Sequence, residues 1–197
     1  MNRAKNFMAG SSFNPEDEPL ENKVVSLLRK KKLTVACAES CTGGLLAKRI
    51  TNVSGASEIF GCGIVSYSNA VKEKLLFVEK SMLEKYGAVS FAVAAEMAVG
   101  VRKQGESDIG IGITGIAGPS SDGTEKPVGL VYVAISDKTR VKVKQLNIDY
   151  TGENVREYNR YYSSSQALSL IEEYVSAYPH TAEGMTDIET YLSQFRE

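Results

Sequence analysis

The segment Ala38–Gly44, Ala-Glu-Ser-Cys-Thr-Gly-Gly, places a serine beside a cysteine where a strand is expected to turn into a helix. The first N–H groups of a helix have no partner within it, so such a turn suits both an exposed nucleophile and an anion. Ser40 and Cys41 are therefore candidate nucleophiles. A purely structural role is the alternative, in which Ser40 satisfies the turn and Thr42 caps the helix.

Two further loops follow predicted strands. Ser66-Tyr67-Ser68-Asn69 ends one strand, and Lys72 lies one turn into the next helix. A lysine acts as a base only if burial or a nearby cation lowers its pKa from about 10.4 towards neutrality. The alternative for Lys72 is a solvated helix residue. The third loop begins Thr114-Gly115-Ile116-Ala117-Gly118-Pro119 and is rich in N–H groups that suit an anion.

The first loop also contains two adjacent glycines, which bear on anion binding. The Gly43-Gly44 pair permits close approach of a phosphate, but it lacks the spacing of a P-loop or of a dinucleotide-binding fold. His180 is the one histidine, in a polar C-terminal stretch, so a Ser-His-Asp triad or a histidine-rich metal site is not expected. A hydrolase built on this chain would take Lys, Tyr or a carboxylate as its base.

The elements that position these loops alternate along the chain. Hydrophobic periodicity and capping residues predict the elements, with Ser68 or Asn69 starting one helix and Ser90 another. The predicted helices are 20–32, 44–53, 69–77, 80–86, 90–104, 153–178 and 188–195, and the predicted strands are 33–37, 59–67, 108–114, 128–135 and 140–148.

This alternation predicts an α/β fold, with helices on both faces of a mostly parallel sheet. The last two strands are close enough in sequence to form a hairpin. In an open parallel sheet, ligands bind outside the carboxyl ends of the strands, so the three loops are expected to line one pocket. We expect residues 1–17 to form a flexible arm, 18–178 the domain and 179–197 a C-terminal tail.

Composition limits the function classes. The chain has 197 residues and a formal net charge of −1, which argues against a nucleic-acid-binding surface. No apolar run approaches the 18 residues of a membrane span. The three cysteines cannot all pair, which fits a cytoplasmic location.

Five motifs in the same order resemble the CinA C-terminal domain family. They cover roughly residues 20–150 and read Ala-Glu-Ser-Cys-Thr-Gly-Gly from Ala38, Val-Ser-Tyr-Ser-Asn from Val65 with Lys72, Gly-Ala-Val-Ser from Gly87, Thr-Gly-Ile-Ala-Gly-Pro from Thr114, and Lys-Pro-Val-Gly from Lys126. The resemblance implies a three-layer α/β/α domain with a five-stranded mixed sheet, a dimer as the usual assembly, and no metal or organic cofactor.

The resemblance also implies an activity, the hydrolysis of the amide of nicotinamide mononucleotide (NMN) to nicotinic acid mononucleotide and ammonia, in pyridine nucleotide recycling. By position it makes Ser40 the nucleophile, activated by Lys72 directly or through Tyr67. N–H groups of the glycine turn would then stabilise the oxyanion. The residues expected to bind substrate are Thr42, Gly43, Gly44, Asn69, Thr114, Gly115, Gly118 and Arg156.

The chain departs from the family pattern at the start of its last long helix. The family usually has Gly-Asp-Arg and a further Arg four residues later, whereas this chain reads Gly152-Glu153-Asn154-Val155-Arg156. Arg156 or Arg160 is therefore expected to meet the substrate phosphate. Two other functions stay open: a non-catalytic nucleotide- or partner-binding module linked to competence and DNA damage, and a thiol amidase using Cys41.

Overall fold

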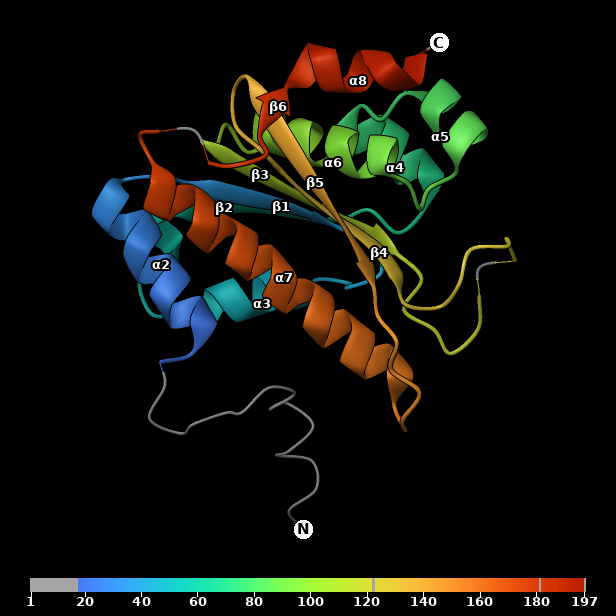
Figure 1. The fold of residues 1–197 in the computed structure, drawn as a ribbon. Helices are drawn as coiled ribbons and strands as arrows, with labels where there is room; N and C mark the ends of the chain where they lie inside the picture. Colours follow the sequence, from blue (N-terminus) through green and yellow to red (C-terminus); the bar gives the residue numbers. More distant parts are fainter. Residues whose placement is uncertain (1–17, 122, 181, 197) are drawn as a thin grey trace.

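The computed structural model describes residues 18–121, 123–180 and 182–196, and within them a single sheet carries helices on both faces (Figure 1). The strands are β1 (Val35–Glu39), β2 (Phe60–Val65), β3 (Ile109–Gly115), β4 (Leu130–Ser136), β5 (Arg140–Asn147) and β6 (Thr186–Asp187). The helices are α2 (Leu20–Lys31), α3 (Leu45–Thr51), the short η1 (Ala56–Glu58), α4 (Asn69–Leu76), α5 (Lys80–Tyr86), α6 (Phe91–Gln104), α7 (Val155–Ala177) and α8 (Ile188–Arg196).

The sheet has the strand order β2-β1-β3-β4-β5-β6. Strand β1 lies parallel to both β2 and β3, while the pairings β3–β4, β4–β5 and β5–β6 are antiparallel. The mixed character of the sheet, which the resemblance implied, is confirmed. The described sheet has six strands and not five, and its pairings are not mostly parallel. The chain returns antiparallel because no helix lies between β3 and β4 in the described residues 116–121 and 123–129. The sixth strand, β6, comes from the segment predicted as a tail.

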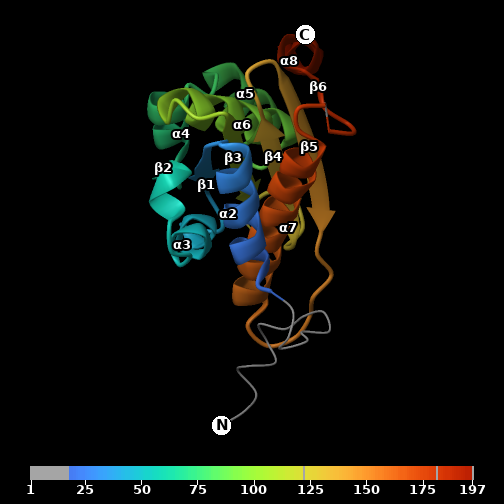
Figure 2. The ribbon, with the colours of Figure 1, turned by 90° about the vertical axis from the view of Figure 1, so that its left-hand side faces the viewer.

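The helices form two layers around this sheet (Figures 1 and 2). Helices α2, α3 and α7 cover one face, where their apolar side chains join those of β1 and β3 in the larger core cluster. Helices α4, α5, α6 and α8 cover the other face. The α/β class and the three-layer arrangement are thus confirmed.

Glycines bring α6 unusually close to β3. The strand alternates isoleucine with glycine, so its isoleucines face the α2 and α7 side and its glycines face α6. A Cβ atom at Gly110 or Gly112 would collide with backbone oxygens of α6, those of Ala98 and Ala94. This close approach fixes α6, and with it the loop before α6, against the centre of the sheet.

Two serine caps predicted from the sequence are confirmed. Ser68 Oγ accepts a hydrogen bond from the N–H of Val71 at 3.3 Å, and Ser90 Oγ accepts one from the N–H of Val93 at 3.3 Å. The segment before Ser68 bonds to the end of β1, through the N–H of Ser66 and the carbonyl oxygen of Glu39. The segment before Ser90 bonds to the end of β3, through the carbonyl oxygen of Ala88 and Thr114 Oγ1. Among the described helices, even the 23-residue α7 has no stretch apolar enough to cross a membrane.

Candidate active site

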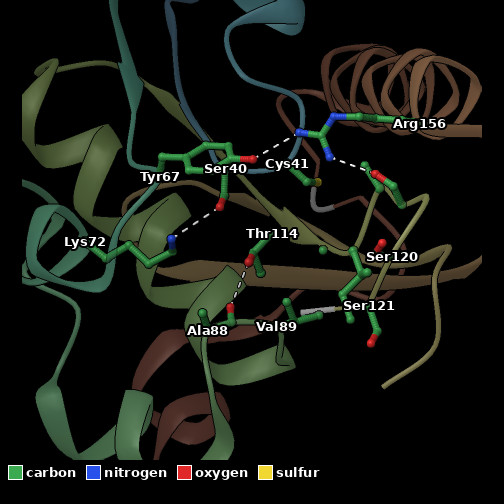
Figure 3. Close-up of a pocket in the computed structure, with 14 residues that line it drawn as sticks. Ser40, Cys41, Tyr67, Lys72, Ala88, Val89, Thr114, Ser120, Ser121 and Arg156 are labelled. Carbon is green, nitrogen blue, oxygen red and sulfur yellow. Dashed lines mark hydrogen bonds between the residues drawn. The ribbon is translucent and has the colours of Figure 1, made fainter. Parts of the chain in front are cut away.

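Ser40 and Lys72 meet at the carboxyl ends of β1 and β2. Ser40 is the first residue after β1, and Lys72 lies in the first turn of α4, which follows β2. Lys72 Nζ is 3.3 Å from Ser40 Oγ (Figure 3). It also donates a 2.7 Å hydrogen bond to the carbonyl oxygen of Ser66. The structure therefore places an amine in contact with a serine hydroxyl, as a Ser–Lys pair requires.

Burial changes the acidity of Lys72. Its side chain is only 1% exposed, and no carboxylate is paired with it among the described residues. Loss of hydration disfavours the charged amine, so burial lowers the pKa of Lys72 from its ordinary value of 10.5 to about 8. The solvated-lysine alternative does not hold, and roughly a tenth of the amine is neutral at pH 7.

Burial shifts the pKa of the neighbouring thiol in the opposite direction. Cys41 is buried beside Ser40, and desolvation raises the pKa of its thiol to about 12, although Arg156 and Lys72 act to lower it. A cysteine attacks as its thiolate, which this environment suppresses. The geometry therefore favours Ser40 over Cys41 as the nucleophile.

Glu39 shapes the turn that carries Ser40. Its side chain is 1% exposed and accepts hydrogen bonds from three N–H groups at the start of α3, those of Gly44 at 3.0 Å, Leu46 at 3.1 Å and Ala47 at 2.8 Å. The helix N-terminus predicted to attract a phosphate is thus occupied by a carboxylate of the chain itself. Gly44 is the N-cap residue of α3, with φ of 90°, and has no side chain that could accept these N–H groups, so Glu39 supplies the cap.

Tyr67 and Arg156 close one side of the site. Arg156, near the start of α7, donates a 3.0 Å hydrogen bond to Tyr67 Oη and a 2.9 Å hydrogen bond to the carbonyl oxygen of Gly118 (Figure 3). Both acceptors are uncharged, so no carboxylate pairs with this guanidinium in the described hydrogen bonds. The Tyr67 hydroxyl is bonded to Arg156, whereas Lys72 reaches Ser40 directly; a relay through Tyr67 has no hydrogen bond in the described structure.

One turn further along α7, two side chains bond to backbone carbonyl groups of the loops that form the site. Arg160 donates to the carbonyl oxygen of Thr42 from Nε at 3.1 Å and from Nη2 at 2.8 Å. Asn159, which is fully buried, donates a 3.1 Å hydrogen bond to the carbonyl oxygen of Ala117. Arg156 therefore faces the site, and Arg160 positions the nucleophile turn from behind.

Ser40, Lys72 and Arg156 lie on the wall of a cavity of about 310 Å³, at the lower end of the range of roughly 300–1,000 Å³ typical of small-molecule sites. All three predicted loops contribute to it, together with the segment before α6. Its lining residues are Ser40, Cys41, Tyr67, Lys72, Ala88, Val89, Thr114, Gly115, Ile116, Ala117, Gly118, Ser120, Ser121 and Arg156. No Asp or Glu is among these described residues, so Lys72 and Arg156 make the cavity electropositive.

The remaining predicted substrate residues lie elsewhere. Thr42 is buried with no partner for its hydroxyl, and Gly43 and Gly44 form the turn behind Ser40; none of the three lines the cavity. Asn69 begins α4 and is exposed outside the cavity. Within the described residues, no group of three or more His, Cys, Asp or Glu side chains could hold a metal ion.

Comparison with known proteins decides the family. The model of the CinA C-terminal domain matches residues 17–175, which include every lining residue of the cavity. The chain belongs to the CinA C-terminal domain family. The resemblance seen in the five motifs is therefore confirmed.

Relatives of this CinA C-terminal domain have related names. A "CinA-like protein" of Desulfovibrio desulfuricans is 49% identical over 162 residues, 81% of this chain and 37% of its own length. One of Kosmotoga olearia is 54% identical over 135 residues, 68% of this chain and 33% of its own length. The chain thus spans about a third of the length of the curated relatives it matches.

Solved structures share the fold. The crystal structure of the competence/damage inducible protein CihA from Agrobacterium tumefaciens superposes with a TM-score of 0.73 at 33% identity. The match covers 78% of this chain and 92% of that one. The architecture described above is therefore that of the CinA superfamily.

Sequence reasoning missed Glu39 and Asn159 within this CinA domain. The signal for Glu39 is an acidic residue that ends a buried strand just before a helix whose N-cap is glycine. Asn159 has no comparable signal, because its partner, the carbonyl oxygen of Ala117, lies 42 residues away in sequence.

Proposed function

We propose that this domain hydrolyses the carboxamide of NMN, with Ser40 as nucleophile and Lys72 as general base. The observation that carries the proposal is the contact between Ser40 Oγ and the buried Lys72 Nζ at 3.3 Å. Lys72 is anchored through the carbonyl oxygen of Ser66, so its neutral amine has a lone pair available for the Ser40 proton.

The reaction proceeds in two steps on this pair. Ser40 Oγ attacks the carboxamide carbon and passes its proton to Lys72 Nζ, which then donates it to the departing ammonia. The acyl group stays on Ser40 as an ester. A water molecule then attacks the ester while losing a proton to Lys72, which returns it to Ser40 Oγ as nicotinic acid mononucleotide leaves.

The oxyanion needs N–H donors near Ser40. The N–H groups of Ser40, Gly43 and Gly44 are already bonded, to the carbonyl oxygens of Ile113 and Ser40 and to Glu39, respectively. The N–H of Cys41, the residue after the nucleophile, has no hydrogen bond to another described residue. We assign the oxyanion to this N–H group.

Charge supports a substrate that carries phosphate. Arg156 reaches the rim with its charge unpaired by any carboxylate in the described hydrogen bonds, and Ser120 and Ser121 lie along the same wall. A phosphate oxygen can replace Tyr67 as its acceptor and gain a charge-assisted hydrogen bond. Thr114, Gly115 and Gly118 line the adjoining wall and complete the nucleotide site.

The test is ammonia release from NMN by the purified protein. We expect turnover by the wild type and a loss of about a hundredfold or more in Ser40→Ala and in Lys72→Ala. Lys74→Ala, an exposed lysine of the same helix, is the matched control and is expected to retain activity. Wild-type protein that is folded but releases no ammonia would contradict the proposal.

A second candidate function rests on the names of the relatives. Several curated relatives carry competence-damage inducible names, and the chain spans 37% of their length. A non-catalytic module that binds a nucleotide or a partner fits those names. NMN binding in the same cavity without ammonia release would favour it.

A further inference from the structure

The last two elements lie beyond the part of the chain that matches the family. The match ends at residue 175, whereas β6 and α8 occupy residues 186–196. They are nevertheless integrated into the domain. Strand β6 pairs with β5, and Leu192 of α8 is buried against Ala95 of α6 and Val141 of β5. This C-terminal segment therefore has a role in the domain that the proposed reaction does not explain.

The free end of α8 packs on the end of α5 (Figures 1 and 2). Tyr86, the last residue of α5, donates a 3.0 Å hydrogen bond from its hydroxyl to the carbonyl oxygen of Phe195. The two rings also meet edge to face, with centroids 5.5 Å apart and planes at 84°. Such an aromatic pair contributes about 0.5–1.5 kcal/mol beyond its buried area.

Tyr86 begins the segment 86–89, whose backbone carbonyl groups accept hydrogen bonds from side chains outside α8. The carbonyl oxygens of Tyr86 and Val89 both accept hydrogen bonds from Lys126 Nζ, each 2.7 Å long. The carbonyl oxygen of Ala88 accepts a 2.7 Å hydrogen bond from Thr114 Oγ1, which is visible in Figure 3. That of Gly87 accepts one from Ser90 Oγ at 3.0 Å. Four consecutive carbonyl groups are thus each bonded to a side chain.

This segment is also a wall of the cavity. Ala88 and Val89 line it opposite Ser40, and Thr114, which binds the segment, lines it too (Figure 3). Helix α8 therefore contacts the outer side of a segment whose inner side faces the site. Ala88 and Val89 follow Tyr86 by only two and three residues, so a displacement of Tyr86 would also displace them.

We infer that α8 positions this cavity wall, with Phe195 and Tyr86 as positioning residues for the substrate. The kinetic part of this inference rests on the proposed function; the structural part does not. Neither residue touches the cavity, so their effect is on substrate affinity and not on the chemistry at Ser40.

The experiment compares two variants with a control inside the same helix. Phe195→Ala removes the ring contact, and Tyr86→Phe removes only the hydroxyl. Gln194→Ala is the matched control, because its side chain is exposed and its described hydrogen bond, to the carbonyl oxygen of Thr190, stays within α8. Amide hydrogen exchange of residues 86–93 is measured in each protein by mass spectrometry, together with that of 188–196.

We expect exchange in 86–93 to rise about three- to tenfold in Phe195→Ala, less in Tyr86→Phe and not at all in Gln194→Ala. With NMN as substrate, KM should rise by about the same factor while kcat changes less than about twofold. Faster exchange in 188–196 with unchanged exchange in 86–93 would overturn the inference.

The two proposals fail in different ways. If the wild type does not turn over NMN, the exchange measurement still decides whether α8 holds the wall. If NMN is hydrolysed but KM and exchange are the same in all four proteins, the positioning role is wrong and the reaction stands. Tyr86→Phe retains the ring and keeps the test valid if Phe195→Ala fails to fold.

Discussion

Lys72 can take the Ser40 proton only while its amine is neutral, and burial decides at which pH that holds. With a pKa of about 8, roughly a tenth of the amine is neutral at pH 7 and about nine tenths at pH 9. In the proposed mechanism the neutral form is active, so activity rises as pH increases through the pKa.

We therefore expect kcat/KM for NMN to increase about tenfold between pH 6 and 7 and to level off above pH 8 to 9. The measurement is a pH profile of ammonia release between pH 6 and 10. Lys74→Ala should keep the profile, whereas Lys72→Arg should lose activity at every pH, because a guanidinium does not deprotonate in proteins. A flat wild-type profile across pH 6 to 9 would exclude Lys72 as the base.

The residues of the candidate site were predictable to different extents. Ser40 and Lys72 follow neighbouring parallel strands, and the carboxyl ends of such strands converge, so their meeting follows from the pattern. The different positions of Arg156 and Arg160 could not be predicted from the sequence pattern. Both lie on one face of α7, and only the docking of that helix decides which of them reaches the cavity and which reaches the carbonyl oxygen of Thr42.

At the scale of elements, the buried Glu39 takes the place of a helix cap. Three N–H groups of the first turn of α3 converge on its two carboxylate oxygens. An amide in the same position would turn an NH₂ group towards at least one of these donors. The turn between β1 and α3, and with it Ser40, depends on this carboxylate.

Glu39→Gln should accordingly lower the free energy of unfolding by about 1–3 kcal/mol, because at least one buried N–H group loses its acceptor. Glu58→Gln is the control: Glu58 is exposed and pairs with Arg29 on the surface, so little change is expected. Urea unfolding at pH 7 measures both. Equal stability of the two variants would show that the cap does not hold the turn.

Helix and strand positions were largely predictable, because periodicity and serine caps depend on residues close together in sequence. Ser68 and Ser90 start α4 and α6 as predicted. Strand β6 was not predictable. It has two residues, Thr186 and Asp187, and pairs with Arg140 and Val141, so no alternating pattern could reveal it.

At the scale of the molecule, the alternation of elements predicted too few antiparallel strand pairings, although the sequence contained a signal for them. A parallel connection needs a crossover, usually a helix, and none was predicted between 114 and 128. The antiparallel pairing of β3 with β4 follows directly from that absence. The hairpin of β4 and β5 was predicted and is confirmed.

One arginine joins three helices of the layer formed by α2, α3 and α7. Arg49 of α3 is 4% exposed and donates to Glu21 of α2 at 2.8 Å and to Ser164 and Ser165 of α7 at 2.9 and 2.7 Å. Its guanidinium also lies 4.6 Å from the centroid of the Tyr161 ring. The first and last helices of this layer are thus connected through a buried cation.

Arg49→Met should lower the free energy of unfolding by about 2–4 kcal/mol, because it leaves the Glu21 carboxylate and two hydroxyl groups without their donor. Lys23→Met is the matched control. Lys23 also joins α2 to α7, through Glu172 at 2.6 Å, but its side chain is 53% exposed, so its removal should change stability little. Urea unfolding of both variants at pH 7 distinguishes a buried connection from a surface one. Equal losses in the two variants would mean that Arg49 adds no more than a surface ion pair, and that apolar packing alone holds α2, α3 and α7 together.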